Sequence, residues 1–299
     1  MKTYLDCVPC FVRQALDAMR MTTDDPALHE RLVREVLAMA LKLDFSSSPP
    51  ELGQQIHRRL RELTGVLDPY IRMKDRFNRM ALSMLPELRA LMAESGRPFE
   101  TAVRLSIAGN IIDMGVKSGI REDEVRDAVS RVLTEPFHGD SARFKKALDA
   151  AETVLFVADN AGEIVLDKLL IEQLDARRVT VAVRGAPVIN DATIEDARAA
   201  GLTDLVEVID NGSDAPGTIL SDCSDEFRRR FRNAGLIIAK GQGNFETLSD
   251  EPANIFFLFK AKCPVIAGHV GLPVGAHVLM HSDAARRKTR RLERIVSNE

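Results

Sequence analysis

The sequence has little of several features that would define a function class. Its 299 residues include no Trp, two Tyr and four Cys, and the formal net charge is −3. The pI is near 6.1, so the chain lacks the basic surplus of a nucleic-acid-binding protein and we expect no nucleic-acid partner. No run approaches the roughly 20 apolar residues of a membrane span, so we expect no membrane partner. The shortage of Trp and Tyr leaves few rings to stack a nucleobase.

The N-terminal residues lack the apolar core of a secretory signal, because Asp6 and Pro9 interrupt it, and we expect a cytoplasmic protein. Four Cys in a chain of this length do not make a disulfide framework, so free thiols are the default. Cys7 and Cys10 have the spacing of half a zinc site or of a redox pair, but no second Cys pair follows. His57 is a further candidate ligand. Packing, structural-metal and redox roles stay open for the pair.

Hydrophobic periodicity divides the chain near residue 148. Before this point apolar residues such as Leu32 and Val36 recur at helical spacing, which predicts an all-helical domain over residues 1–148 that carries the Cys pair. After it, strands alternate with helices, which predicts an α/β domain with a Rossmann-like parallel sheet and flanking helices over residues 149–282. Residues 283–299 are expected to form a basic tail or helix.

The strongest chemical signal is an apolar strand that ends in polar residues. A strand at residues 154–157 is followed by Asp159 and Asn160, and Glu163 begins the next helix. Ligands bind at the carboxyl ends of strands in open α/β sheets. A carboxylate beside a carboxamide offers the hard oxygen ligands that Mg²⁺ or Mn²⁺ prefers. Capping of the helix is the competing interpretation, since Asp and Asn are common caps.

Three more strands are predicted to end near the same edge. The strand at residues 179–184 is followed by Asn190 and Asp191, and parallel neighbours about 4.8 Å apart can share one ion. The strand at residues 236–239 ends in Lys240, and glycines after it permit close approach of the backbone to a ligand. A strand is predicted at residues 263–268. The polar and glycine residues that follow Lys240 are Gly241, Gly243 and Asn244.

Two motifs in the helical half are candidates to support this edge. Asn110 and Asp113 are three residues apart and face the same way on a helix, within an apolar segment where polar residues need a reason. Mutual hydrogen bonding at a domain interface is the alternative. Lys74 and Asn78 form an i, i+4 pair that would look the same on any exposed helix.

In this order along the chain, the motifs resemble the metal-dependent damage-control phosphatases, a family long catalogued as a domain of unknown function. The resemblance covers nearly the whole chain, from Cys7 and Cys10, through the segment from Asp68 to Asn78 and the strand ends above, to residues 260–264. The Cys pair resembles the microbial branch, as distinct from branches fused to pantothenate kinase-like domains or carrying an Arg-Thr-x-Lys motif.

The resemblance implies a divalent metal held by Asp159, Asn160 and Asp191, with Mn²⁺ first and Mg²⁺, Co²⁺ or Ni²⁺ as alternatives. It implies that substrate phosphate meets the loop at residues 241–244 and Lys262, with Lys260 able to take part of that role. The expected reaction is hydrolysis of phosphomonoesters of small metabolites, such as sugar phosphates or damaged phosphometabolites, by metal-activated water. The expected catalytic set is Asp159, Asn160, Asp191 and Lys262; the expected substrate-binding set is Glu163, Lys240, Gly241, Gly243, Asn244, Asn110 and Asp113.

The main alternative is a Rossmann-like nucleoside-binding protein or an AdoMet-dependent methyltransferase. Either predicts a Gly-rich loop directly after the first strand and an acidic residue at the end of the second. Here the first loop has one glycine, Gly162, and the second strand ends in Arg184. A non-catalytic metal-binding regulator built around the Cys pair leaves the strand-end clusters unexplained. The oligomeric state and the general base are open, with Glu163 and Asp191 both candidates to orient the water.

Overall fold

A computed structural model gives the fold of residues 1–109, 126–127, 129, 131 and 133–288, which are the residues described below. Its first part is helical: α1 (Cys7–Thr22), α2 (Pro26–Leu41), α3 (Pro49–Thr64), α4 (Ile71–Glu94) and α5 (Pro98–Ala108). Strands are β1 (Phe137–His138), β2 (Val154–Val157), β3 (Val179–Val183), β4 (Glu207–Asp210), β5 (Leu236–Lys240), β6 (Ile255–Lys260) and β7 (His277–His281). The remaining helices are α8 (Ser141–Ala150), α9 (Glu163–Ile171), η1 (Ala176–Arg178), α10 (Ile194–Ala199), α11 (Asp225–Asn233), α12 (Gly241–Leu248) and α13 (Pro264–Val270).

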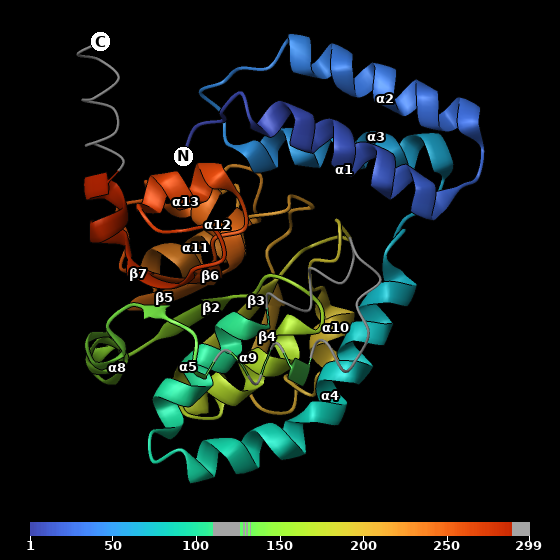
Figure 1. The fold of residues 1–299 in the computed structure, drawn as a ribbon. Helices are drawn as coiled ribbons and strands as arrows, with labels where there is room; N and C mark the ends of the chain where they lie inside the picture. The colour runs from blue at the N-terminus through green and yellow to red at the C-terminus, as the bar shows by residue number, and fades with distance from the viewer. Residues whose placement is uncertain (110–125, 128, 130, 132, 289–299) are drawn as a thin grey trace.

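The strands form one seven-stranded sheet in the order β1-β7-β6-β5-β2-β3-β4. The five strands from β6 to β4 run parallel, and β7 is antiparallel to β6. The predicted α/β fold is therefore confirmed, and the predicted parallel sheet is mostly parallel, with the antiparallel pairing of β7 to β6 as the exception. Parallel strands are joined through crossovers, and here helices supply them on both faces of the sheet (Figure 1).

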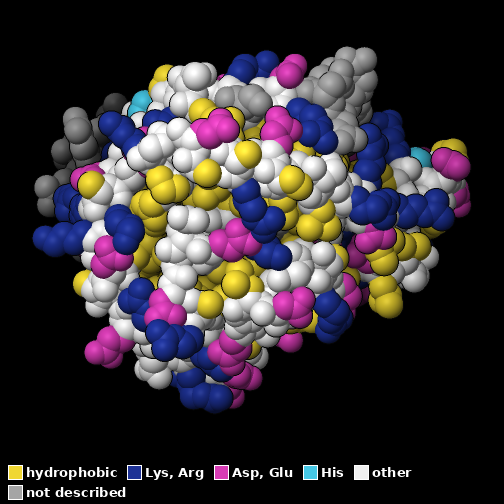
Figure 2. Space-filling view, turned by 90° about the horizontal axis from the view of Figure 1, so that it is seen from below, with side chains coloured by type: hydrophobic (Ala, Val, Ile, Leu, Met, Phe, Trp, Pro, Cys, Tyr) yellow, Lys and Arg dark blue, Asp and Glu magenta, His cyan; other side chains and the backbone are white. Residues whose placement is uncertain are grey.

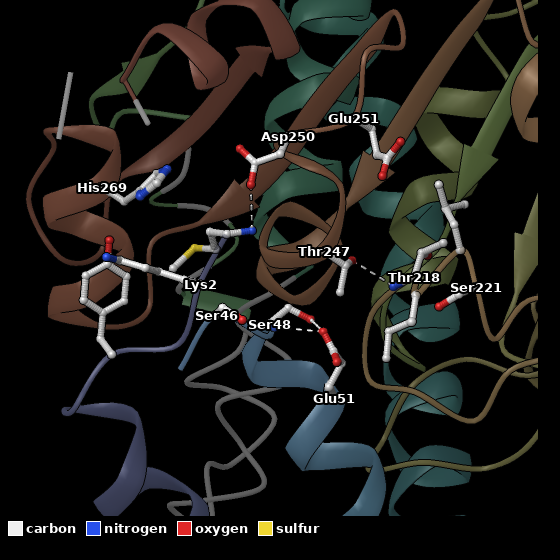
Figure 3. A pocket seen from close by; sticks show the side chains of 14 residues that line it. Lys2, Ser46, Ser48, Glu51, Thr218, Ser221, Thr247, Asp250, Glu251 and His269 are labelled. Carbon is white, nitrogen blue, oxygen red and sulfur yellow. Dashed lines mark hydrogen bonds and ion pairs between the residues drawn. The ribbon is translucent and has the colours of Figure 1, made fainter. Parts of the chain in front are cut away.

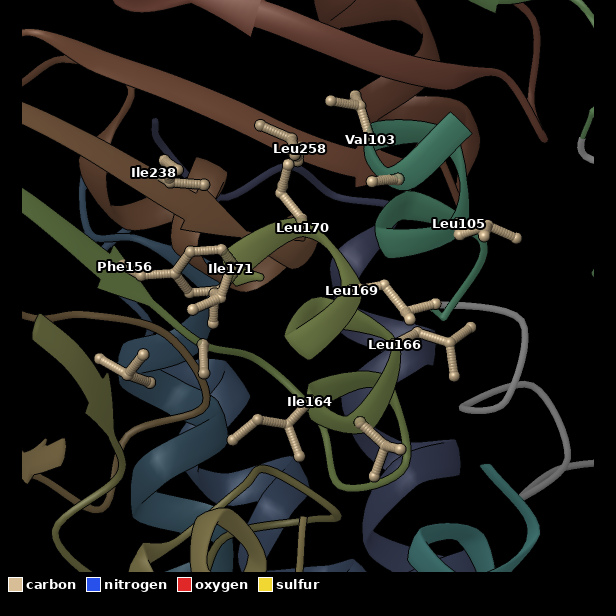
Figure 4. Close-up of a cluster of buried hydrophobic side chains, with 14 of the residues drawn as sticks. Val103, Leu105, Phe156, Ile164, Leu166, Leu169, Leu170, Ile171, Ile238 and Leu258 are labelled. Carbon is tan, nitrogen blue, oxygen red and sulfur yellow. The ribbon is translucent and has the colours of Figure 1, made fainter. Parts of the chain in front are cut away.

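Alternating side chains of the central strands enter two hydrophobic cores. Phe156 of β2 and Ile238 of β5 point to the face covered by α5 and α9 (Figure 4). Leu155 and Ile237, one residue earlier on the same strands, point to the face covered by α11, α12 and α13. Full burial of each such side chain stabilises the fold by about 1.5–3 kcal/mol. Burial on both faces explains why these strands read as continuous apolar runs.

Helices α1, α2 and α3 have a third core of their own, which includes Phe11, Leu32 and Leu60. Figure 1 shows this three-helix unit at one end of the molecule, with α4 leading from it toward α5. Helices α4 and α5 contribute instead to the core that contains β2 and α9. The cores thus divide the chain after α3, whereas hydrophobic periodicity changes near residue 148, because periodicity reports the type of element and not the core that it joins.

The prediction of a strand at residues 263–268 was wrong, because this segment forms α13. Pro264 occupies the first helical position, where its missing N–H costs nothing. Gly271 ends the helix in the left-handed conformation with φ 63°. The strand lies just before it, as β6, and ends at Lys260. Residues 282–288 are helical, and residues 289–299 of the expected basic segment lie outside the described residues.

The charge on the surface shown in Figure 2 is mixed. Lys and Arg side chains are interspersed there with Asp and Glu, and hydrophobic side chains lie between them. Within the described parts of the chain, none of the helices combines the length and the apolar character needed to cross a membrane.

Candidate active site

The sheet has a topological switch point between β2 and β5. From β2 the chain proceeds to β3 and β4 on one side, and it then returns to β5 and β6 on the other. Crossovers on either side leave a crevice at the carboxyl ends of the two strands, which is where ligands bind in open α/β sheets. Asp159 follows β2 by two residues, and Gly241 directly follows β5. The sequence motifs therefore meet at the position that the topology favours.

Main-chain hydrogen bonds join the loops that follow β2 and β3. The amide of Ala192 donates to the carbonyl of Asp159 at 2.7 Å, and the backbones of Asn160 and Asp191 form an isolated antiparallel bridge. The Asn160 Nδ2 donates to Asp159 Oδ2 at 2.6 Å and to Glu163 Oε2 at 2.9 Å. The structure thus brings together the three residues predicted to hold a metal. Because Nδ2 is the donor, the carboxamide oxygen is the atom of Asn160 able to accept.

Gly241 lets α12 approach this group closely. Its φ is 77°, and a Cβ built there would lie 1.8 Å from Asp159 Oδ2. A Cβ on Gly243 would lie 2.3 Å from the carbonyl oxygen of Pro216. Both glycines are needed for packing within the loops, and the first places the start of α12 directly against the Asp159 carboxylate.

Like charges crowd Asp159. Burial raises the pKa of Asp159 well above its ordinary value, and the Glu163 and Asp191 carboxylates raise it further, while Lys262 and Arg184 oppose the shift. The Arg184 guanidinium is 1% exposed; its Nε donates to Asp191 Oδ2 at 2.6 Å, and its Nη2 lies 3.7 Å from Asp159 Oδ1. A further cation at this position would be stabilised by the two carboxylates.

Asn244, predicted to bind substrate, contacts the scaffold. Its Nδ2 donates to the carbonyls of Lys240 at 2.7 Å and Ala158 at 3.1 Å. Its Oδ1 accepts from Thr218 Oγ1 at 2.7 Å and from Arg184 at 3.3 Å. These bonds link the end of β2 to the end of β5, so the Asn244 side chain stabilises the two loops of the site.

Lys240, also predicted to bind substrate, is fully buried in an ion cluster. Its Nζ lies 2.7 Å from Glu163 Oε1 and 2.6 Å from Asp167 Oδ1, and it donates to the carbonyl of Ser106 in α5. Burial lowers the pKa of Lys240, but the Asp167 and Glu163 carboxylates more than offset this, so the net pKa is raised. Burial raises the pKa of Asp167 to about 7 despite the lysine. The cluster ties α9 to β5 and α5.

Residues 3–278 match the family described as the Damage-control phosphatase ARMT1-like domain. The chain belongs to this family. A damage-control phosphatase of Archaeoglobus fulgidus is 39% identical over 277 residues, covering 90% of this chain and 95% of that protein. A damage-control phosphatase of Pyrococcus horikoshii is 35% identical over 288 residues, covering 94% of this chain and 99% of that one.

The fold agrees with a solved structure of the same family. The crystal structure of a DUF89 family protein from Pyrococcus horikoshii matches with a TM-score of 0.85 and 35% identity over 94% of this chain and 99% of that chain. Membership of the damage-control phosphatase family supports a phosphatase in metabolite repair. The assignment to the microbial branch through Cys7 and Cys10 stays a prediction.

Lys262 and Lys260, the two lysines expected near phosphate in the damage-control phosphatases, face different surroundings. The Lys262 ammonium lowers the pKa of Asp159, and its main-chain N–H donates to Gln242 Oε1 at 3.0 Å. Lys260 is half-buried, and burial lowers its pKa, with Glu135 opposing the shift and Lys262 adding to it. The electrostatic influence on Asp159 favours Lys262 as the lysine of the site.

The helical half supports the turn after β2 through Asn78. Asn78 Oδ1 accepts from the Gly162 amide at 2.7 Å, and its Nδ2 donates to Asp196 Oδ1 at 2.8 Å. Lys74 pairs with Asp196 at 2.8 Å and with Asp68 at 3.2 Å. The motif that looked least specific in the sequence therefore positions the start of α9. Asn110 and Asp113 lie outside the described residues.

Sequence reasoning did not assign Arg184, Thr218 or Asp167 to the site. The available signal was an arginine at the end of an apolar strand, where a buried charge needs partners. Thr218 and Asp167 lie in segments without a motif, and only the tertiary structure brings them to the site.

Cys7 and Cys10 lie at the start of α1, and both are free thiols. Burial raises the pKa of Cys7, and Glu246, Cys263 and Cys10 raise it further. His57 lies in α3, where burial lowers its pKa to about 4, and its ring packs beside Tyr70. Among the residues that the structure describes, no three His, Cys, Asp or Glu side chains are placed to hold one metal ion. The proposed ligands Asp159, Asn160 and Asp191 are not such a group, because one of the three is an asparagine.

A cavity of about 630 Å³ lies elsewhere, between the N-terminal segment, the start of α3 and the end of α12 (Figure 3). The Met1 ammonium and Asp250 carboxylate, 3.2 Å apart, line it with Thr218 and Thr247. It contains none of the residues predicted to bind metal or phosphate. Two of its lining residues also contact Asn244: Thr218 Oγ1 donates to Asn244 Oδ1 at 2.7 Å, and Thr247 Oγ1 donates to the Asn244 carbonyl at 3.3 Å.

Proposed function

We propose that the protein is a metal-dependent phosphatase that hydrolyses phosphomonoesters of small metabolites, either sugar phosphates or damaged phosphometabolites. The main support for this proposal is that two loops bring Asp159, Asn160 and Asp191 together at the switch point of the sheet. Family membership and relatives named damage-control phosphatase support the same reaction class.

The donor set fits a hard divalent cation. Two carboxylates and one carboxamide offer oxygen atoms only, which suits Mn²⁺ and Mg²⁺ and does not strongly exclude Co²⁺ or Ni²⁺. The raised pKa of Asp159 supports this fit, because the ionised carboxylate gains from a nearby positive charge. Such an ion polarises a phosphoryl group and lowers the pKa of bound water.

The chain supplies the remaining groups. Arg184 holds Asp191 in place through its Nε and neutralises part of the charge. The first N–H groups of α12 and the ammonium of Lys262 stabilise negative charge that develops on the phosphoryl oxygens. Lys240 forms ion pairs with Glu163 and Asp167 and thereby keeps Glu163 fixed beside Asn160.

The direct test is release of phosphate from an aryl phosphate by the purified protein. After chelation we expect little activity, and Mn²⁺, Co²⁺, Ni²⁺ or Mg²⁺ should restore it. A panel of phosphorylated metabolites at fixed Mn²⁺ then identifies the preferred substrate. Equal turnover in excess chelator would refute the metal-dependent mechanism.

The role of Lys262 has a matched control in Lys260. Lys262→Ala should weaken binding of inorganic phosphate by about 10-fold or more, because one charge-assisted contact contributes roughly 1.5–3 kcal/mol. Lys260→Ala removes an equal charge from the end of β6 and should change phosphate affinity much less. The assignment fails if Lys260→Ala has the larger effect.

A further inference from the structure

Asn190 has a buried carboxamide without a partner. The residue is 0% exposed, and neither its Oδ1 nor its Nδ2 has a hydrogen-bond partner among the described residues. Other described side chains with such buried atoms have one each, as in Ser249. Burial of an unpaired polar group costs about 1–3 kcal/mol. Two such atoms on one side chain therefore need a physical reason.

The main chain fixes Asn190 between the proposed metal ligands. Its carbonyl accepts from the amide of Ala161 at 2.9 Å, one residue after Asn160. It directly precedes Asp191, whose backbone pairs with that of Asn160. Asn190 thus belongs to the pair of loops that forms the site.

The residue before it has a strained backbone. Ile189 has φ 46°, and it is the one non-glycine residue with positive φ among those described. A β-branched residue is a conformational outlier there, at a cost of order 1–3 kcal/mol. The surrounding structure holds it, because Ile189 packs against the α1–α3 core and Arg61 donates to the Pro187 carbonyl at 2.8 Å. These contacts therefore fix the backbone conformation of the residue that precedes Asn190.

We propose that Asn190 is a further ligand-binding residue of this site, an inference that rests on the proposed function. A cation requires oxygen ligands, and the oxygens of a phosphate bound to it require hydrogen-bond donors. A neutral carboxamide offers both atoms from one side chain, whereas Asp159 and Asp191 offer acceptors alone. With both ligands bound, Oδ1 would serve as an acceptor or ligand toward the cation or its water, and Nδ2 would donate to a phosphoryl oxygen.

The test uses Asn190→Leu, which keeps the approximate volume and removes both polar atoms. The metal-free variant should melt at a higher temperature than the wild type, because the unpaired amide is gone. Its affinities for Mn²⁺, and for inorganic phosphate in the presence of Mn²⁺, should each fall about 10-fold or more. Ser249→Ala is the matched control: it removes a buried unpartnered hydroxyl at the end of α12 and should leave both affinities unchanged.

A second variant separates the two atoms. Asn190→Asp replaces the donor by a negative charge, so it should retain or tighten Mn²⁺ binding while phosphate affinity falls about 10-fold or more, seen also as a raised KM. Wild-type affinities for both ligands in Asn190→Leu, or equal weakening of both in Asn190→Asp, would overturn the assignment and leave the phosphatase proposal standing. Failure of the wild-type protein to bind Mn²⁺ would instead refute the proposed function and this inference with it.

Discussion

Asp159→Asn distinguishes a metal ligand from a structural loop residue at the position on which the proposed site depends. The substitution preserves shape and removes one negative charge. Gly162 occupies the cap position of α9 and no side chain caps that helix, so the capping interpretation of Asp159 is not supported. A purely structural role in the loop predicts little effect of a change that preserves the shape of the side chain. As a ligand, the same change removes one of two carboxylates from a divalent site. The Asp159 side chain is 10% exposed, so water cannot easily replace the lost oxygen.

The expected effect of Asp159→Asn on the melting temperature differs in sign with and without metal. Without metal, burial and the Glu163 and Asp191 carboxylates disfavour the ionised form of Asp159, so its removal should leave the melting temperature unchanged or raise it. With Mn²⁺ at about 100 times the wild-type Kd, the ion stabilises the wild type by about 2.7 kcal/mol. A chain of this size shifts its Tm by roughly 2 °C per kcal/mol, which gives about 5 °C. If the affinity falls on the order of 100-fold, the shift at the same Mn²⁺ concentration is about 1 °C.

The assay is a thermal-shift titration with Mn²⁺ together with turnover of an aryl phosphate. Asp140→Asn is the matched control, because Asp140 caps α8 by accepting from the Arg143 amide at 2.8 Å on the surface. It should leave both the titration and the turnover unchanged. Near-normal turnover and an unchanged Mn²⁺ titration in Asp159→Asn would refute the ligand assignment and leave Asp159 a structural residue of the loop.

Three further predictions follow from the charges and thiols. Burial raises the pKa of Glu246 to about 7, so the folded protein binds this proton more tightly than the unfolded protein. Glu246 alone should therefore lower stability by up to about 3 kcal/mol as pH rises from 4.5 to 7. Glu246→Gln should remove this contribution and make the Tm-against-pH curve less steep, while the contributions of Asp159 and Asp167 remain. Arg184→Met and Lys240→Met should each destabilise the metal-free protein by about 3–5 kcal/mol, and Mn²⁺ should rescue the Tm of the first alone. Cys7→Ser with Cys10→Ser should keep most turnover per folded molecule, whereas loss of turnover in a folded, metal-loaded variant would place the pair in the active site.

The sheet could be predicted because its strands are buried on both faces. A continuous apolar run such as residues 154–157 or 236–239 is typical of a central parallel strand when helical segments lie before and after it. The segment at residues 263–268 misled for the same reason, since a short apolar run does not separate a strand from a buried helix. Pro264 was the available signal, because proline is typical of a first helical turn.

The site was predictable where topology alone brings residues together. Asp159, Asn160 and Asp191 follow adjacent parallel strands, so their meeting follows from strand order. The role of Lys240 could not be predicted, because a lysine at a strand end has the same sequence pattern whether it faces a ligand or a buried carboxylate. Its contacts with Glu163 and Asp167 depend on how α9 and α5 pack against the sheet.

The buried charge at this edge of the sheet connects the scaffold to the proposed chemistry. Its acidic members are Asp159, Glu163, Asp167 and Asp191, and its basic members are Arg184 and Lys240. When these six buried groups are ionised, two negative charges are left over among them. The partly buried Lys262 offsets part of this excess at Asp159, and a divalent cation would neutralise it. Without such an ion, the raised pKa values of Asp159 and Asp167 favour proton uptake as the other way to remove the excess. The two buried cations therefore do more than hold loops: they reduce the carboxylate charge to the amount that a single ion can balance.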